Sequence, residues 1–204
     1  MLYELSHFIK EHLSWAWEAV ECLNAEIFGI QHRKMLRKIP AIIEAYNGRF
    51  VVVSAGIGDV PALVRFFAGQ PNAAYEFFRP HNFDAETLAK LVRRKSFLMF
   101  VVKDSDDIVG YFFLRCFANG TSFKGRIVDY RHRNQGMAKI MGSAINDIVL
   151  ALNLRLFTTI SPDNYASLSS TKAVNDIKIV RTLQNGYYYI ECTPKSDGLN
   201  GGGI

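Results

Sequence analysis

The sequence predicts an α/β (α+β) fold in which a mixed, mostly antiparallel central sheet is flanked by helices. Three observations support this prediction. Apolar, β-branched runs of strand length alternate with segments in which apolar residues recur at helical spacing. Turn sequences at residues 104–107, 119–120 and 185–186 each separate two apolar runs and predict hairpins, which pair strands antiparallel. One further run, residues 121–129, leads through a basic turn directly into a helix.

The first 47 residues predict an N-terminal helical extension. Residues 3–24 repeat apolar residues at three- and four-residue steps, as an amphipathic helix does, whereas Gly29 and Pro40 interrupt the pattern of residues 25–46. Basic residues gather at 32–38, and two interpretations stay open for them. They suit a surface that contacts an anionic lipid, a partner chain or a second copy of this chain. Alternatively, they are the solvated side of helices packed on the domain.

Asn47-Gly48 is a turn signal, and from residue 48 the pattern is that of one domain. A strand at residues 49–55 precedes a helix that starts near Pro61 and is capped by Asp59. After a segment rich in aromatic residues, a second helix occupies residues 84–94, and strands follow at 96–102 and 108–117.

The remaining elements follow the basic turn. A helix, a strand at residues 155–160 and a helix at 163–174 lead to a hairpin of residues 177–183 and 187–192. Residues 196–204 are rich in Gly and Asn and predict a flexible tail. The predicted parts are therefore the extension, 1–47, the domain, 48–195, and the tail, 196–204.

Composition narrows the functional classes. No apolar run in the 204 residues is long enough to span a membrane, and the N-terminus lacks the basic start and cleavage site of a signal peptide, so we expect a cytoplasmic protein without integral membrane contact. Cys22, Cys116 and Cys192 are widely spaced, and we expect neither a disulfide framework nor a metal site. The net charge of +5 and pI of 9.1 are compatible with nucleic acid, an anionic membrane or a polyanionic small molecule as a partner, and equally with charges spread over a solvated surface; we expect no nucleic-acid partner.

The basic turn before the helix, residues 133–139, is the strongest functional signal. Apolar spacing from Ile140 to Ile148 places Gly136 and Ala138 in the first turn of this helix. A helix N-terminus exposes unpaired N–H groups and the positive end of the helix dipole, and small residues let a bulky anion approach the backbone. Arg131, Arg133 and Lys139 add positive charge, so this turn predicts a phosphate or pyrophosphate site.

Arg133-x-x-Gly136-x-Ala138, preceded by a strand that ends in Ile127-Val128-Asp129, resembles the acyl-CoA-binding motif of the GNAT acyltransferase superfamily. A second element of that family, Asn-x-x-Ser, is matched by Asn164 and Ser167 after the strand at 155–160. The resemblance covers roughly residues 50–194. It implies a GNAT-like acetyltransferase that moves an acetyl or similar acyl group from acetyl-CoA, used as a co-substrate without a metal, directly to an amine or hydroxyl.

The resemblance also implies roles for particular residues. The acceptor would be a small molecule, with an amino sugar or glycan precursor as one option, and a non-catalytic acyl-CoA-binding or regulatory domain is the alternative. Backbone groups of the strand before the motif would bind the pantetheine arm and the thioester carbonyl, the turn would hold the pyrophosphate, and the second element would contact pantetheine or orient the next helix. The cofactor-binding residues are thus Ile127, Val128, Arg133, Asn134, Gln135, Gly136, Met137, Ala138, Lys139, Asn164 and Ser167.

The catalytic residues are less clearly marked. Many members of the family carry a tyrosine seven residues beyond the matching Asn, where it protonates the departing thiolate, and Thr171 occupies that position here. For the general base we expect His81, whose ordinary pKa of about 6.5 is suitable, or Glu76 acting through water. Aromatic and polar residues of the 70–84 segment either shape an acceptor pocket or are core and surface residues. The predicted acceptor contacts are Tyr75, Phe78, Arg79 and, from a central strand, Arg115.

Overall fold

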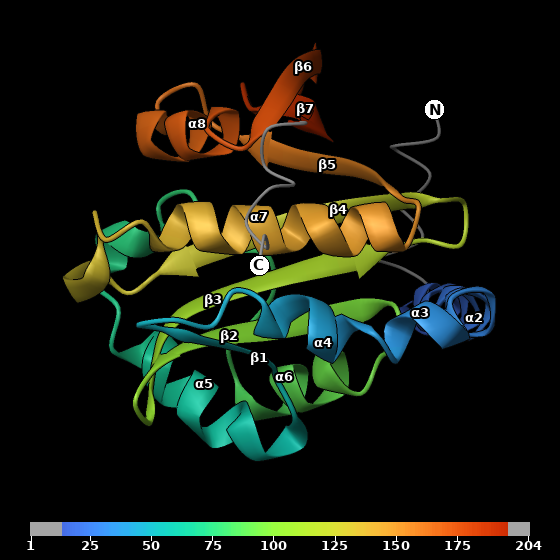
Figure 1. Cartoon of the computed structure of the whole chain (residues 1–204). Helices are drawn as coiled ribbons and strands as arrows, with labels where there is room; N and C mark the ends of the chain where they lie inside the picture. Colours follow the sequence, from blue (N-terminus) through green and yellow to red (C-terminus); the bar gives the residue numbers. More distant parts are fainter. Residues whose placement is uncertain (1–13, 196–204) are drawn as a thin grey trace.

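The computed structural model describes residues 14–195, and Figure 1 shows its arrangement as a sheet between two layers of helices. The sheet has seven strands in the order β1-β2-β3-β4-β5-β7-β6. Among the described strands only β4 and β5 pair parallel, which confirms the mixed, mostly antiparallel sheet. The strands are β1 (Val51–Ser54), β2 (Phe97–Asp104), β3 (Asp107–Cys116), β4 (Thr121–Val128), β5 (Arg155–Ile160), β6 (Asn175–Thr182) and β7 (Tyr188–Pro194).

Helices cover both faces of the sheet. One face carries α5 (Val60–Ala68) and α6 (Ala85–Val92), and the other carries α4 (Ile39–Glu44) and α7 (Met137–Ala151). The other helices are α2 (Ser14–Gln31), α3 (Arg33–Leu36) and α8 (Tyr165–Lys172), with single 3₁₀ turns at Ile57–Asp59, Asn72–Tyr75 and Tyr130–His132. Within residues 14–195, no helix combines the length and apolar character required to cross a membrane.

The two faces of the sheet have separate hydrophobic cores. Side chains of a strand alternate between faces, so each strand contributes to both layers. Phe112 and Leu114 of β3 pack with Met141, Ile145 and other apolar residues of α7. The intervening residues Tyr111 and Phe113 pack with α5 and α6 on the opposite face. The α5/α6 face is mainly aromatic near β3, which matters for the candidate site.

The N-terminal helices differ from the prediction. The helix predicted to end at residue 24 continues to Gln31, because Gly29 is buried in α2 beside Lys95 and does not interrupt it. Residues 3–13 of that prediction lie outside the described residues, as does the tail at 196–204. Val20 and Leu23, two members of the apolar repeat in residues 3–24, are 58% and 62% exposed, whereas the other side of α2 is buried. Periodicity identified the helix but not the face that packs on the domain.

The N-terminal helices and the rest of the domain share one core. Phe28 of α2 and Ile39 and Ile43 of α4 are each at most 4% exposed and belong to the same hydrophobic cluster as β2, β3 and α7. Ion pairs add to this packing, since Glu21 of α2 contacts Arg94 and Arg115. The helices are thus a packed layer, and the boundary at residue 47 stays a prediction about function.

Candidate functional site

The centre of the candidate site is the divergence of β4 and β5. The two strands pair only from Thr121 to Phe123 against residues 155–157 of β5. Beyond this point β4 continues beside β3 as far as Val128, and β5 continues beside β7 as far as Ile160. The hydroxyl of Thr158 donates to the carbonyl of Lys124 over 3.3 Å where the strands separate. The edge of β4 from Lys124 onward therefore has no strand partner on the β5 side.

Backbone direction decides which groups face this gap. The Lys124 carbonyl faces β5, whereas the Asp129 N–H donates to Val109 of β3 over 2.9 Å. Successive backbone groups of a strand point to alternate edges, so the N–H groups of Arg126 and Val128 face the gap and that of Ile127 faces β3. The prediction of Ile127 as a backbone donor therefore differs from the observed register: the Ile127 N–H group faces β3, and the N–H group of its neighbour Arg126 faces the gap.

The basic turn connects β4 to α7 and has the conformation that its sequence requires. Asn134 and Gly136 have φ angles of 61° and 77°, and Gly136 is the residue immediately before α7, not within its first turn. A Cβ atom at Gly136 would meet nothing within 4 Å, so the left-handed backbone, and not crowding, requires glycine here. The first N–H groups of α7 have no partner in the helix, and the exposed Arg133 and Lys139 lie on either side of them.

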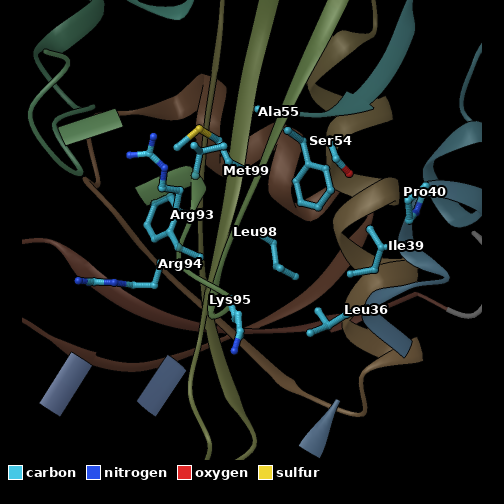
Figure 2. A pocket seen from close by; sticks show the side chains of 13 residues that line it. Leu36, Ile39, Pro40, Ser54, Ala55, Arg93, Arg94, Lys95, Leu98 and Met99 are labelled. Carbon is cyan, nitrogen blue, oxygen red and sulfur yellow. The ribbon is translucent and has the colours of Figure 1, made fainter. Parts of the chain in front are cut away.

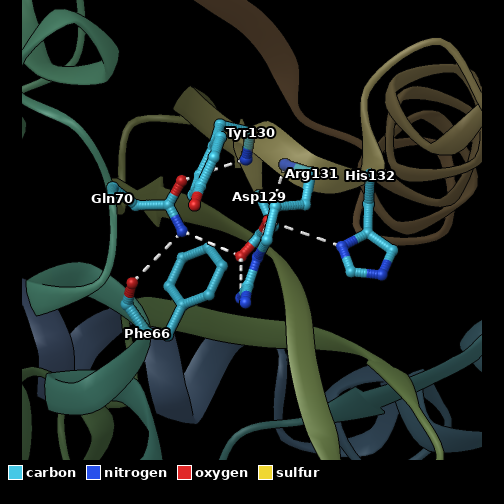
Figure 3. A network of polar contacts seen from close by, with 6 residues as sticks. All are labelled: Phe66, Gln70, Asp129, Tyr130, Arg131 and His132. Atoms are coloured by element: carbon cyan, nitrogen blue, oxygen red, sulfur yellow. Dashed lines mark hydrogen bonds and ion pairs between the residues drawn. The ribbon is translucent and has the colours of Figure 1, made fainter.

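A buried carboxylate holds this turn in place (Figure 3). Asp129 is 1% exposed and accepts hydrogen bonds from the backbone and guanidinium of Arg131 and from Gln70, at 2.8–3.1 Å. Gln70, just after α5, also accepts from the Tyr130 N–H. Burial alone would raise the pKa of Asp129, but the hydrogen bonds from Arg131 and Gln70 hold it well below its usual range. Arg131, one of the three cations predicted to add positive charge at this turn, is therefore paired with Asp129.

His81 lies among aromatic residues on the α5/α6 face. Its Nδ1 is 2.7 Å from the carbonyl oxygen of Asn82, which can only accept, so Nδ1 carries the proton. The other nitrogen, Nε2, accepts from the buried Tyr111 hydroxyl over 2.9 Å. Burial lowers the pKa of His81 below its ordinary value. The imidazole is thus neutral with both nitrogens bonded, and Tyr111 is a partner that sequence spacing did not reveal.

The 70–84 segment divides into core and surface residues. Phe83 stacks on Phe67 with ring centroids 4.0 Å apart, and the hydroxyl of Tyr75 donates to the Phe67 carbonyl. Phe78 borders β4, since a Cβ atom at Gly125 would lie 3.3 Å from its ring. Glu76 and Arg79 are exposed. Tyr75 therefore has a structural contact, and Phe78 is the predicted acceptor residue that lies beside the diverging strand.

Arg115 is not brought to this site. It pairs in register with Phe123, at the end of β3 remote from the turn, whereas Gly110 pairs with Val128 next to the turn. Its guanidinium forms an ion pair with Glu21 of α2. The prediction of an acceptor contact for Arg115 is corrected accordingly: the arginine on a central strand is paired with a carboxylate of the N-terminal helix.

Helix α8 closes the site on the α7 side. Asn164 is its N-cap and accepts from the Ser167 N–H over 3.0 Å, so both residues of the second element start this helix. Thr171 is 1% exposed, and its hydroxyl accepts from Arg126 Nη2 over 3.2 Å. The same guanidinium donates to Ser170 Oγ over 2.9 Å and to the Ala138 carbonyl over 2.6 Å. Arg126, which sequence reasoning passed over, connects β4, α7 and α8.

A separate pocket lies elsewhere on the molecule (Figure 2). It has a volume of about 330 Å³ and is lined by residues of α3 and α4, by Ser54 at the end of β1 with the following Ala55, and by residues 92–95 and 97–100. None of its lining residues comes from β4, β5, α7 or α8. This pocket is therefore not part of the candidate site at the diverging strands. No group of three or more His, Cys, Asp and Glu side chains placed to hold a metal occurs among residues 14–195.

The strand order, the divergence of β4 and β5 and the turn before α7 can be compared with solved structures. The GNAT domain of PAT from S. lividans superposes with a TM-score of 0.60 at 13% identity, covering 69% of this chain and 88% of that one. AAC(6')-Ib in complex with paromomycin and acetyl-CoA gives a TM-score of 0.58 at 9% identity, covering 74% and 96%. The chain has the GNAT fold. A spermidine N-acetyltransferase chimera from Vibrio cholerae and hSSAT gives 0.54 at 17% identity, covering 75% and 99%.

These likenesses are in structure and not in sequence. No family model matches the chain, and no curated protein matches its sequence. The GNAT fold nevertheless accounts for most of the chain, because residues from β1 through β7 form the sheet in the order described above. Helices α2, α3 and α4 precede these strands.

Proposed function

We propose that the protein is an acyl-CoA-dependent N-acyltransferase that moves an acetyl or similar group from acetyl-CoA directly to an amine of a small acceptor. The divergence of β4 and β5 beside the N-terminus of α7 carries this proposal. It combines an unpaired strand edge, which can hydrogen-bond an extended amide chain, with a helix N-terminus that suits a pyrophosphate. Solved structures with the same fold include proteins named as spermidine N-acetyltransferase and as a complex with acetyl-CoA.

In this proposal the pantetheine arm lies along β4. The N–H groups of Arg126 and Val128 face the gap, and they would bind the thioester oxygen as it becomes negative during attack. The turn of residues 133–139 would hold the pyrophosphate, with charge from Arg133 and Lys139. Asn164 and Ser167 would act indirectly, by starting α8 where it closes the site. No covalent enzyme intermediate is required.

The acceptor would approach from the α5/α6 face. The odd-numbered residues of β4 point to that face. Gly125 has no side chain there, and the rings of Phe113 and Phe78 fill the space that a side chain would take. The 70–84 segment also carries two exposed polar residues, Glu76 and Arg79, which would contact an amino sugar or a related polar amine. His81 would accept the proton of the amine, and it would do so through Tyr111, because both of its nitrogens are bonded.

Titration calorimetry with coenzyme A and thiol release with a panel of amines test this function together. Binding with a dissociation constant in the micromolar range, followed by amine-dependent thiol release, is the expected result. Binding without release from any amine favours the second candidate, a non-catalytic acyl-CoA-binding domain. The observation that favours this alternative is Thr171, a buried alcohol where many GNAT members have a tyrosine. Absence of coenzyme A binding would refute both.

We also propose that α2 contacts the α2 of a second copy of the chain. Four large apolar side chains are exposed on one side of this helix, although its other side is buried in the domain. Their steps of three, four and three residues are those of a coiled-coil seam, with β-branched residues at the a positions as in two-stranded coiled coils. The four residues are Val20, Leu23, Ile27 and Ile30.

Light scattering after size-exclusion chromatography tests this contact on the full chain. The expected result is a dimer that becomes a monomer in the double variant Leu23→Glu/Ile30→Glu. Lys34→Glu, an exposed change on the neighbouring helix α3, is the control and should leave the dimer intact. A monomeric wild-type protein would refute the contact.

A further inference from the structure

Arg126 extends from the diverging strand into the space between α7 and α8. It is the third residue of β4 beyond the last pair with β5, and its backbone N–H faces the gap. Its side chain points to the α7 face, where three acceptors fix both terminal nitrogens of the guanidinium: the Ala138 carbonyl, Ser170 Oγ and Thr171 Oγ1, at 2.6–3.2 Å. Gly142 makes room for it, because a Cβ atom there would lie 2.6 Å from Arg126 Nη1.

The position of Thr171 relates the Arg126 guanidinium to the leaving thiolate. Thr171 is the seventh residue after Asn164, the position from which a tyrosine protonates the leaving thiolate in many GNAT members. Its own hydroxyl is buried and serves as an acceptor for Arg126. The guanidinium of Arg126 therefore lies next to the residue from which the tyrosine side chain would extend. Arg126 itself belongs to β4, the strand that would bind the thioester.

The positive charge of Arg126 has no hydrogen-bonded carboxylate partner among residues 14–195. Among the described residues, the hydrogen-bond partners of Arg126 are neutral oxygens. Burial lowers the pKa of Arg126 to about 10, so it stays protonated at neutral pH. Lys124, two residues earlier on the same side of β4, is 3% exposed, and burial lowers its pKa to about 8. Among residues 14–195 its Nζ makes no hydrogen bond by distance and angle, and its neutral neighbour is the Cys192 thiol. Two neighbouring buried cations without a carboxylate favour an anion between the strands and α8.

We propose that Arg126 stabilises the departing coenzyme A thiolate as an ion pair, in place of protonation by a tyrosine. This inference rests on the proposed acyl transfer. The amine nitrogen forms a bond to the acyl carbon, the carbon–sulfur bond breaks, and its electron pair goes to sulfur. The guanidinium keeps its proton and balances the negative charge on sulfur, and the proton of the amine leaves through the base or solvent. Lys124 adds to the positive potential without a required contact.

The thiol of bound coenzyme A reports this interaction directly. Ultraviolet absorbance of the thiolate, followed across pH in the wild-type complex, gives the pKa of the bound thiol. A cation in contact should lower it by about one to three pH units relative to free coenzyme A. Arg126→Met should remove most of this shift and lower kcat more than it raises KM for acetyl-CoA. Arg126→Lys should retain part of the shift, because the charge remains, and Arg65→Met, an exposed arginine on α5, should leave it unchanged.

The possible failures are distinguishable. If coenzyme A binds and acetyl transfer occurs, but the wild-type complex shows no lowered thiol pKa, the role of Arg126 is overturned and the proposed function stands. The same holds if the shift persists fully in Arg126→Met. If coenzyme A does not bind, both proposals fail. Because the measurement on the wild-type protein is decisive alone, it does not depend on the variants folding; circular dichroism and urea unfolding establish which variants can be compared.

Discussion

Replacing Asp129 with asparagine should destabilise the turn that joins β4 to α7. The carboxylate is buried and accepts from the backbone N–H and the guanidinium of Arg131 and from the amide of Gln70. Asparagine keeps the shape and one acceptor oxygen but loses the charge, and its NH₂ group would face donors. Since Gln70 follows α5, the substitution also weakens the connection between the two sides of the site.

The magnitude follows from the partners. A hydrogen bond to a charged group contributes a net stability of about 1.5–3 kcal/mol. The side chain of Arg131 is 64% exposed, so solvent screens its part of the interaction, and the buried bonds to Gln70 and the Arg131 backbone carry most of the effect. We therefore expect a loss of about 1–3 kcal/mol in the free energy of unfolding at pH 7, together with weaker binding of coenzyme A.

The pH dependence gives a second test. The pKa of Asp129 is lowered in the folded protein relative to about 3.9 in the unfolded chain, so its contribution to stability is present above that value and is lost as pH falls through the folded pKa. In urea unfolding, the difference between the wild-type and Asp129→Asn proteins should be smaller at pH 3 than at pH 7 but should not vanish, because the lowered pKa keeps Asp129 largely charged in the folded protein at pH 3. Asp106→Asn, an exposed turn residue, is the control. A constant difference between wild type and variant at both pH values would contradict the assignment of the charge.

Three other predictions concern the backbone, the core and the base. Gly136→Val should lower coenzyme A affinity tenfold or more, because φ of 77° is strained for a β-branched residue; unchanged affinity in a folded variant, measured by calorimetry, would argue against the turn as the pyrophosphate site. Gly125→Ala should cost about 1–3 kcal/mol in urea unfolding, since its Cβ would lie 2.4 Å from the Phe113 ring, and a neutral effect would mean that the rings move freely. His81→Gln should remove the acidic limb of the kcat/KM profile with coenzyme A affinity intact; a wild-type profile would eliminate His81 as the base.

We predict that the first 47 residues are not required for coenzyme A binding, although they contribute to the stability of the domain. A chain that starts near Gly48 loses Phe28, Ile39 and Ile43 from the core, and we expect reduced stability in urea unfolding. If the shortened chain folds, the prediction from sequence is that it still binds coenzyme A, because the turn and every strand follow residue 48. A folded truncation without binding would make these helices part of the cofactor site.

Sequence determined the features that depend on local chemistry. The turns at residues 104–107, 119–120 and 185–186 fixed the hairpins, because Asn-Gly pairs and short polar turns encode their backbone conformation. Helix caps are local in the same way, because the side chains of Asp84 and Asn164 each accept from a backbone N–H group three residues further on. Gly136 marked the basic turn, although the structure assigns its need for glycine to the backbone angle and not to crowding.

Tertiary structure decided what depends on residues far apart in the chain. Asp129 and Gln70 are 59 residues apart, and Arg126 and Thr171 are 45 apart, so no local pattern signals either contact. Strand register decides which edge of β4 faces β5. The sequence prediction named Ile127 as a backbone donor, whereas the register turns the N–H group of Arg126 toward the gap. Likewise, apolar spacing on two sides of α2 could not say which side packs on the domain. Local sequence encodes turns, caps and periodicity, whereas register and burial arise only when the strands and helices pack together.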